Sequence, residues 1–239
     1  MNATSQSRRS LFKRVCCGAG LALGTALPGI APAAGSKKTD LTPDQALNLL
    51  KEGNAKFITD SPVRAVAGRE RRLEIARGQL PFAVLVSCAD SRVPPELLFG
   101  RGLGELFIVR NAGNTVDAVA LGSIEYAVAE LGVPLIVVMG HERCGAVDAA
   151  MSVVEKNTAF PGSIGQMIEP IIPAVLKAKA GSQKLSGDAL LDASVRENVR
   201  RVVGRLHNSE PILLEPLRAG KLKIVGARYD LDDGAVEFF

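Results

Sequence analysis

The chain has 239 residues, of which 47% are hydrophobic and 23% are charged, and its formal net charge is +4. This composition is ordinary for a globular protein, and the length suffices for one substantial domain. The positive charge lies largely in the N-terminal segment, and no run of Lys and Arg with interleaved aromatic residues follows it. We therefore expect no nucleic-acid partner.

Residues 1–33 have the pattern of an export signal. A twin-arginine pattern occurs at Ser7–Lys13, a mostly small and apolar stretch runs from Val15 to Ile30, and Ala31–Ala33 offers a cleavage site. A basic segment, a short apolar segment and a small-residue end are together typical of a signal peptide. The alternative is an uncleaved membrane anchor, but the stretch is short for a span and rich in glycine. We expect twin-arginine export to the periplasm or outside the cell, with no membrane attachment after cleavage.

A polar linker is expected at residues 34–40, followed by one folded domain over residues 41–239. Thr42 and Pro43 are typical of a helix start, because a hydroxyl can cap the first turn and proline fits the first helical position. Gln45 completes a capping box with Thr42. A short charged helix is expected at Arg69–Arg77.

Polar side chains gather where the first predicted strand ends. The apolar, β-branched run that begins at Val84 reads as a buried strand of a parallel sheet, and Cys88, Asp90 and Arg92 follow it. In open α/β sheets, ligands bind beyond the carboxyl ends of the strands. These three residues are therefore expected where chemistry takes place.

A second buried strand repeats this arrangement. The run Pro134–Gly140 is apolar, and His141 and Cys144 follow it directly. If the two strands are neighbours in the sheet, Cys88, His141 and Cys144 converge on one point.

The remaining pattern is that of βαβ units. The expected fold class is α/β, with a mostly parallel sheet of four strands, a C-terminal antiparallel strand and flanking helices. The further strands are expected at Leu106–Arg110, Leu222–Arg228 and Ala235–Phe239, and the further helices at Val93–Phe99, Val116–Leu131, Gly145–Val154, Ser163–Ala180 and Ala189–His207.

Two thiolates and one imidazole are good donors for zinc, and a site with three protein ligands keeps a fourth position for water or substrate. The alternative is that Cys88 and Cys144 are small buried hydrophobes and His141 is a core histidine. All three residues follow strand ends, which favours zinc, one ion per chain.

These residues resemble the zinc signature of the β-class carbonic anhydrases. Cys88-x-Asp90-x-Arg92 and His141-x-x-Cys144 carry the resemblance, and it extends from about Leu41 to the C-terminus. Family-like blocks occur in family order at Ser87–Pro94, Gly104–Asn114, Ser123–Ala127 and Gly140–Gly145. The resemblance implies reversible hydration of CO2 to bicarbonate and a proton, by means of a zinc-bound hydroxide.

Asp90 has two expected roles. The resemblance implies that Asp90 orients the zinc-bound hydroxide, and that Arg92 positions Asp90 through a bidentate pair. A carboxylate two residues from a ligand can also reach the zinc itself. We expect Asp90 to be a metal ligand only in a closed, low-pH state.

The resemblance also implies a substrate pocket and an assembly. Gln79 resembles the family glutamine that helps to hold substrate, and Phe107 and Tyr126 fall in matching blocks as pocket walls, although either ring alone could be plain core. Ala112 stands where many plant-type members have Val. The implied assembly is a homodimer or a dimer of dimers, with the helix at Pro43 packing on another subunit.

Two other functions remain in competition at this stage. A relative on the same scaffold could hydrolyse carbonyl sulfide or carbon disulfide with the same metal and nucleophile. A zinc-stabilised binding protein without catalysis is the other alternative, although Asp90 and Arg92 are both present.

Overall fold

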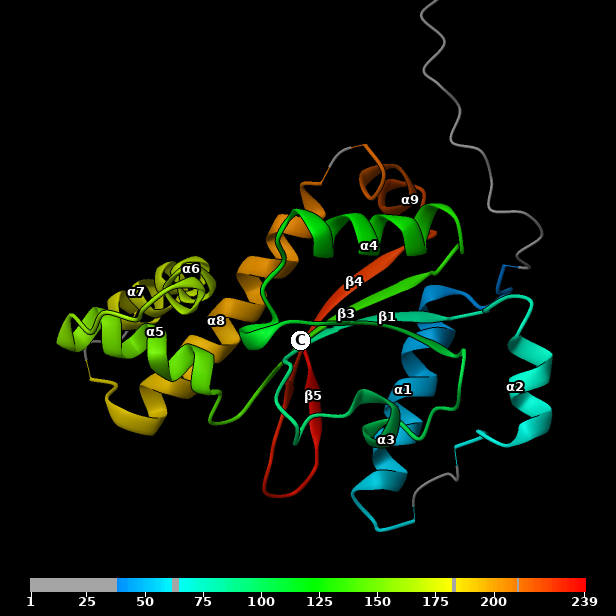
Figure 1. The fold of residues 1–239 in the computed structure, drawn as a ribbon, viewed down its shortest axis with the longest axis horizontal. Coiled ribbons are helices and arrows are strands. Elements are labelled where there is room, and N and C mark those ends of the chain that lie inside the picture. The colour runs from blue at the N-terminus through cyan, green and yellow to red at the C-terminus, as the bar shows by residue number, and fades with distance from the viewer. Residues whose placement is uncertain (1–37, 62–64, 182–183, 210) are drawn as a thin grey trace, which may run out of the picture. The chain divides into compact units, whose positions relative to one another are not determined.

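Five strands form one mixed sheet at the centre of the fold (Figure 1), in the order β2-β1-β3-β4-β5. Strands β1 to β4 run parallel, and β5 pairs antiparallel with β4. This confirms the expected fold class. The strands are β1 (Ala83–Ser87), β2 (Leu106–Arg110), β3 (Leu135–His141), β4 (Lys223–Tyr229) and β5 (Val236–Phe238).

The computed structural model describes residues 38–61, 65–181, 184–209 and 211–239, which belong to one compact unit. The expected export signal at residues 1–33 lies outside the described residues, as does most of the expected linker at 34–40. Among the described helices, none is both long and apolar enough to cross a membrane.

Helices cover both faces of the sheet. The helices are α1 (Pro43–Phe57), α2 (Arg69–Ile75), α3 (Pro95–Leu98), α4 (Ala118–Ala129), α5 (Gly145–Lys156), α6 (Ser163–Ile168), α7 (Ile172–Gly181), α8 (Gly187–His207) and α9 (Leu214–Arg218), with short 3-10 turns η1 (Ala112–Asn114) and η2 (Glu169–Ile171). Along β1, Val84 and Val86 pack toward α4 and α8, whereas Ala83 and Leu85 pack toward α1 and α3. This two-residue alternation is the geometry of a strand buried on both faces.

A third apolar cluster lies beyond the carboxyl ends of β1 and β3, where α5, α6 and α7 gather (Figure 1). Val147, Ile171 and Leu190 are fully or almost fully buried there, and they pack with Cys88 and Cys144. The two cysteines therefore lie in a protected, largely apolar setting.

Helix α1 begins as the sequence predicts and packs on the sheet of its own chain. Thr42 Oγ1 accepts a hydrogen bond from Gln45 N, and Gln45 Oε1 accepts one from Thr42 N, which completes the capping box. The helix then buries Ala46 and Leu50 against the sheet of its own chain. Packing of α1 on another subunit stays a prediction; within its own chain, the helix covers one face of the sheet.

Two helix predictions differ from the structure. The single helix expected over Ser163–Ala180 is divided into α6, η2 and α7. Pro170 lies at this break, and proline lacks the N–H that a continuous helix requires. Helix α9 was not predicted, because its five residues are too few to show a helical period.

Asn54 of α1 ties that helix to the turn before β5. Its Nδ2 donates to Gly234 O at 2.9 Å and to Leu98 O at 3.4 Å, and its Oδ1 accepts from Val236 N at 2.8 Å. Since Asn54 is buried, these backbone groups have no water to replace it.

We therefore expect Asn54→Ala to lower the free energy of unfolding by roughly 2–4 kcal/mol, because one backbone donor and two backbone acceptors lose their partner. Chemical denaturation would measure it. Asn208→Ala is the matched control, since Asn208 makes an exposed bond to Gly204 O within its own helix; we expect a change of at most about 0.5 kcal/mol. Equal effects of the two substitutions would contradict the assignment.

Candidate metal centre and active site

Three potential ligands meet at the carboxyl ends of two neighbouring strands. Cys88 follows β1, His141 ends β3, and Cys144 caps the start of α5. Strands β1 and β3 pair in parallel, with Ser87 opposite Met139, so the residues that follow lie at the same edge. The Sγ atoms of both cysteines and a ring nitrogen of His141 all lie within 4.8 Å of one another.

The state of His141 suits a metal ligand. Its Nδ1 lies 2.8 Å from the carbonyl oxygen of Glu142, which can only accept, so Nδ1 carries the proton. The opposite nitrogen, Nε2, is then a lone-pair donor, and it is fully buried without a hydrogen-bond partner. A buried nitrogen left in this state is costly unless something binds it. The side chains present therefore fit a zinc ion, which prefers thiolates and imidazole.

The two thiols differ in acidity. Gly113 N donates a hydrogen bond to Cys88 Sγ at 3.3 Å. The Cys144 thiol and this backbone donor hold the pKa of Cys88 well below its usual value, whereas the same contact with Cys88 raises the pKa of Cys144. The contact thus favours the thiolate form of Cys88, and a thiolate attracts a cation.

Asp90 and Arg92 form a bidentate ion pair beside this cluster. Arg92 Nε donates to Asp90 Oδ1 at 3.0 Å and Arg92 Nη2 donates to Asp90 Oδ2 at 2.8 Å, while Arg92 N also donates to Oδ1. Asp90 Oδ2 lies 3.8 Å from His141 Nε2. The carboxylate therefore faces the position at which the three ligands converge.

The Arg92 side chain holds the pKa of the Asp90 carboxyl well below its usual range. Because the folded-state pKa is depressed, the ion pair stabilises the fold above the ordinary pKa of an aspartate, about 3.9. This stabilisation is lost as the pH falls through the depressed value. Asp90 is consequently a carboxylate at any neutral or alkaline pH.

Arg110 and Asn198 also shape the site, and sequence reasoning missed both. Arg110 at the end of β2 donates to the carbonyl oxygens of Cys88 and Asp90, at 2.9 Å and 2.6 Å. Asn198 of α8 donates to Gly113 O at 2.8 Å. A charged residue that ends an apolar strand could have indicated Arg110, whereas nothing local marks an asparagine in mid-helix.

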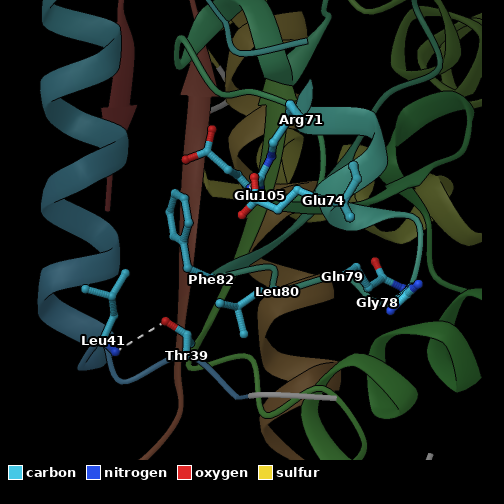
Figure 2. A pocket seen from close by; sticks show the side chains of 11 residues that line it. Thr39, Leu41, Arg71, Glu74, Gly78, Gln79, Leu80, Phe82 and Glu105 are labelled. Carbon is cyan, nitrogen blue, oxygen red and sulfur yellow. Dashed lines mark hydrogen bonds and ion pairs between the residues drawn. The ribbon is translucent and has the colours of Figure 1, made fainter. Parts of the chain in front are cut away.

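Of the four predicted pocket residues, only Ala112 lies beside the cluster formed by Cys88, His141 and Cys144. Ala112 lies in η1 next to Gly113, whose N–H contacts Cys88. Gln79 precedes β1 and is exposed at the opposite end of that strand. Figure 2 shows it in a cavity of about 540 Å³ together with Arg71 and Phe82.

Phe107 and Tyr126 contact each other, with ring centroids 6.4 Å apart, but lie away from the ligands. Phe107 pairs with Val84, four residues and thus about 13 Å of strand before Cys88. Within one chain, then, Gln79, Phe107 and Tyr126 do not share a pocket with the cluster. To line the substrate pocket as predicted, these residues would have to lie beside the ligand cluster of a second copy of the chain.

A second acidic group lies nearby and is accounted for by arginines. The carboxylates of Glu142, Asp230 and Asp232 lie within 4.8 Å of one another. Arg143 forms a two-bond ion pair with Asp232, and Arg228 pairs with Asp230 at 2.9 Å. This network fixes the loop that carries His141 and Cys144.

The chain is thus an α/β protein with a mostly parallel sheet and a candidate metal site of two cysteines and one histidine, beside an Asp–Arg pair. The family model described as carbonic anhydrase matches residues 83–236. The chain belongs to the carbonic anhydrase family, and its structural neighbours place it in the β class.

Curated relatives agree over most of their length. The carbonic anhydrase of Mycolicibacterium smegmatis is 40% identical over 195 residues, which is 82% of this chain and 92% of that protein. Carbonic anhydrase 2 of Mycobacterium tuberculosis is 41% identical over 192 residues, or 80% and 90% of the two chains.

Solved structures show the same fold. A Coccomyxa β-carbonic anhydrase in complex with acetazolamide is 34% identical, with a TM-score of 0.63 over 69% of this chain and 74% of that chain. A structure from work on two tetrameric β-carbonic anhydrases of Sordaria macrospora is 26% identical, with a TM-score of 0.65 over 70% and 84%.

We expect the purified chain to bind one zinc ion and Cys144→Ala to lose most of it, because two donors seldom retain zinc. Metal analysis after equilibrium dialysis would measure this. Ser87→Ala is the control: Ser87 is buried beside Cys88 and its hydroxyl has no partner, so its loss should leave zinc binding intact. Full zinc retention by a folded Cys144→Ala protein would rule out the ligand set.

Proposed function

We propose that the protein catalyses the reversible hydration of CO2 to bicarbonate and a proton, with one zinc ion held by Cys88, His141 and Cys144. The observation that carries the proposal is the convergence of these three ligand atoms within 4.8 Å, with Asp90 Oδ2 3.8 Å from His141 Nε2. Membership of the carbonic anhydrase family supports the reaction type.

Zinc, when bound, would lower the pKa of a coordinated water toward about 7 and so supply the nucleophile that attacks the carbon of CO2. The protein's own part is orientation and proton handling. Asp90 is ionised, so it can only accept a hydrogen bond, and its Oδ2 faces the ligand cluster. It can therefore accept a hydrogen bond from the attacking water. This bond would direct a lone pair of the water oxygen toward the substrate.

Arg92 keeps Asp90 available for this role. Its three N–H contacts occupy both carboxylate oxygens and fix the plane of the carboxyl group. Arg110 holds the backbone of the same loop from β2. A closed state, in which Asp90 leaves Arg92 and becomes a fourth ligand at low pH, is part of the proposal.

We expect Asp90→Asn to lower the rate of CO2 hydration about a hundredfold or more, because the amide is uncharged and its NH2 group must face either an Arg92 donor or the water. Stopped-flow hydration with zinc counted on the same sample would measure it. Asp44→Asn is the control, since Asp44 is an exposed ion-pair partner of Lys223 in the first turn of α1. Undiminished hydration in zinc-loaded Asp90→Asn would refute the assigned role.

The pH profile tests the closed state. We expect wild-type hydration to rise between about pH 6 and 9. In Arg92→Gln the rise should move to higher pH, because a carboxylate freed from its ion pair competes better with water for the metal. Lys179→Gln, which removes an ion pair with Glu155 between α7 and α5, should keep the wild-type profile. A flat wild-type profile would reject the closed state.

We propose a homodimer or a dimer of dimers as the working assembly. Strand β2 is the edge of the sheet, and Val119 and Tyr126 of the adjoining α4 are 78% and 44% exposed. Apolar exposure beside a strand edge favours association. One solved relative is described as tetrameric. Sedimentation analysis that finds only monomer would exclude this assembly.

We also propose twin-arginine export, followed by action in the periplasm or outside the cell. The pattern Ser7–Lys13 and the small-residue site Ala31–Ala33 support it. Fractionation of cells that express the full chain tests it, with Arg8→Lys and Arg9→Lys combined as the variant expected to remain inside.

A further inference from the structure

A second polar cavity, of about 220 Å³, lies between α8 and the segment that leads into α4. Its polar lining consists of Thr115, Asn198, Arg201 and Arg205, and prolines of the η2–α7 region close one side. The cavity holds none of the three metal ligands, nor Asp90 or Arg92. It is therefore a site separate from the metal centre.

The charge in this cavity is uncompensated. Arg201 and Arg205 are its only charged lining residues, and they lie four positions apart on one face of α8, where like charges repel. Neither forms an ion pair with a carboxylate of the described residues. Among the described residues, Arg201 has no hydrogen-bond partner either. Arg205 donates one hydrogen bond through Nη1 to Val116 O, and its other N–H groups can donate to a ligand.

Two other arginines of α8 have carboxylate partners. Arg196 pairs with Asp192 and Glu237, and Arg200 lies 3.8 Å from Glu197 and over the ring of Phe239. The two cavity arginines are thus set apart from those that stabilise the protein. Arg201 and Arg205 are exposed, and their guanidinium groups repel each other one turn apart, so an anion between them is the complementary occupant.

The size and donor set define the anion. A cavity of about 220 Å³ holds a trigonal or tetrahedral ion, but not a nucleotide. Guanidinium groups bind oxyanions by paired N–H donors, and the Thr115 hydroxyl can donate beside them. We propose that this cavity binds a small inorganic oxyanion, with Arg201 and Arg205 as its principal ligands.

The cavity wall also reaches the metal centre. Asn198 lines the cavity and donates to Gly113 O, and Gly113 N in turn donates to Cys88 Sγ. An anion bound there lies two hydrogen bonds from a metal ligand. The binding itself does not depend on the proposed reaction.

Methyl NMR of the zinc-loaded full chain tests the proposal, with Val116 and Val202, which line the cavity, as reporters. Sulfate, phosphate and bicarbonate are titrated separately at constant ionic strength, balanced with sodium chloride. We expect saturable shifts of both residues. Arg201→Gln should weaken the binding at least about tenfold, because a charge-assisted contact is lost, whereas Arg200→Gln should leave it unchanged.

Arg201 has no hydrogen-bond or ion-pair partner in the described part of the chain, so its variant should fold as the wild type does. Equal affinities for the three ions would indicate a general oxyanion site, and tighter bicarbonate binding would indicate that the site takes the reaction product; both support the proposal. Shifts that grow linearly without saturation, or an affinity that Arg201→Gln does not change, would overturn it. Because bicarbonate can also reach the metal, only shifts that Arg201→Gln weakens count as binding here.

Discussion

The parallel pairing of β1 with β3 is the constraint on which the rest of the structure depends. Each strand is fully buried, and the pairing places Ser87 beside Met139, so that the residues after each strand emerge together. A shift of one residue in register would turn every side chain of a strand to the other face and separate Cys88 from His141. The apolar faces of these strands therefore fix the chemistry at their ends.

Around that edge, hydrogen bonds from three side chains restrain three loops at once. Arg110 binds the carbonyl groups after β1, Arg143 binds Asp232 after β4, and Asn198 holds Gly113 after β2. Gly113 has a φ of +71°, and a Cβ there would lie 2.5 Å from Ile171 Cδ1, so close packing and backbone shape both require glycine. Preorganised loops of this kind let the ligands keep their places without adjustment during reaction.

Much of the fold and the ligand cluster could be predicted from the sequence, because both depend on local patterns. Buried strands are continuous apolar runs, and their carboxyl ends mark where Cys88, His141 and Cys144 meet. The contacts of Arg110 and Asn198 join segments that are distant in the sequence. Such contacts leave no periodic pattern of hydrophobic residues from which they could be predicted. Gln79, Phe107 and Tyr126 could not be placed in this way. Resemblance to a family indicates which residues line a pocket, but not whether they line it in their own chain or in a second copy.

The separation of the ligands along the chain also bears on how the protein matures. Cys88 and His141 are divided by all of α3, β2, η1 and α4. Closing such a loop costs entropy, and long-range parallel pairing forms late relative to local structure. A metal ion cannot gather these side chains in an unfolded chain as it does in a small zinc finger. Binding of the proposed zinc ion is consequently expected as a finishing step, after the sheet has assembled.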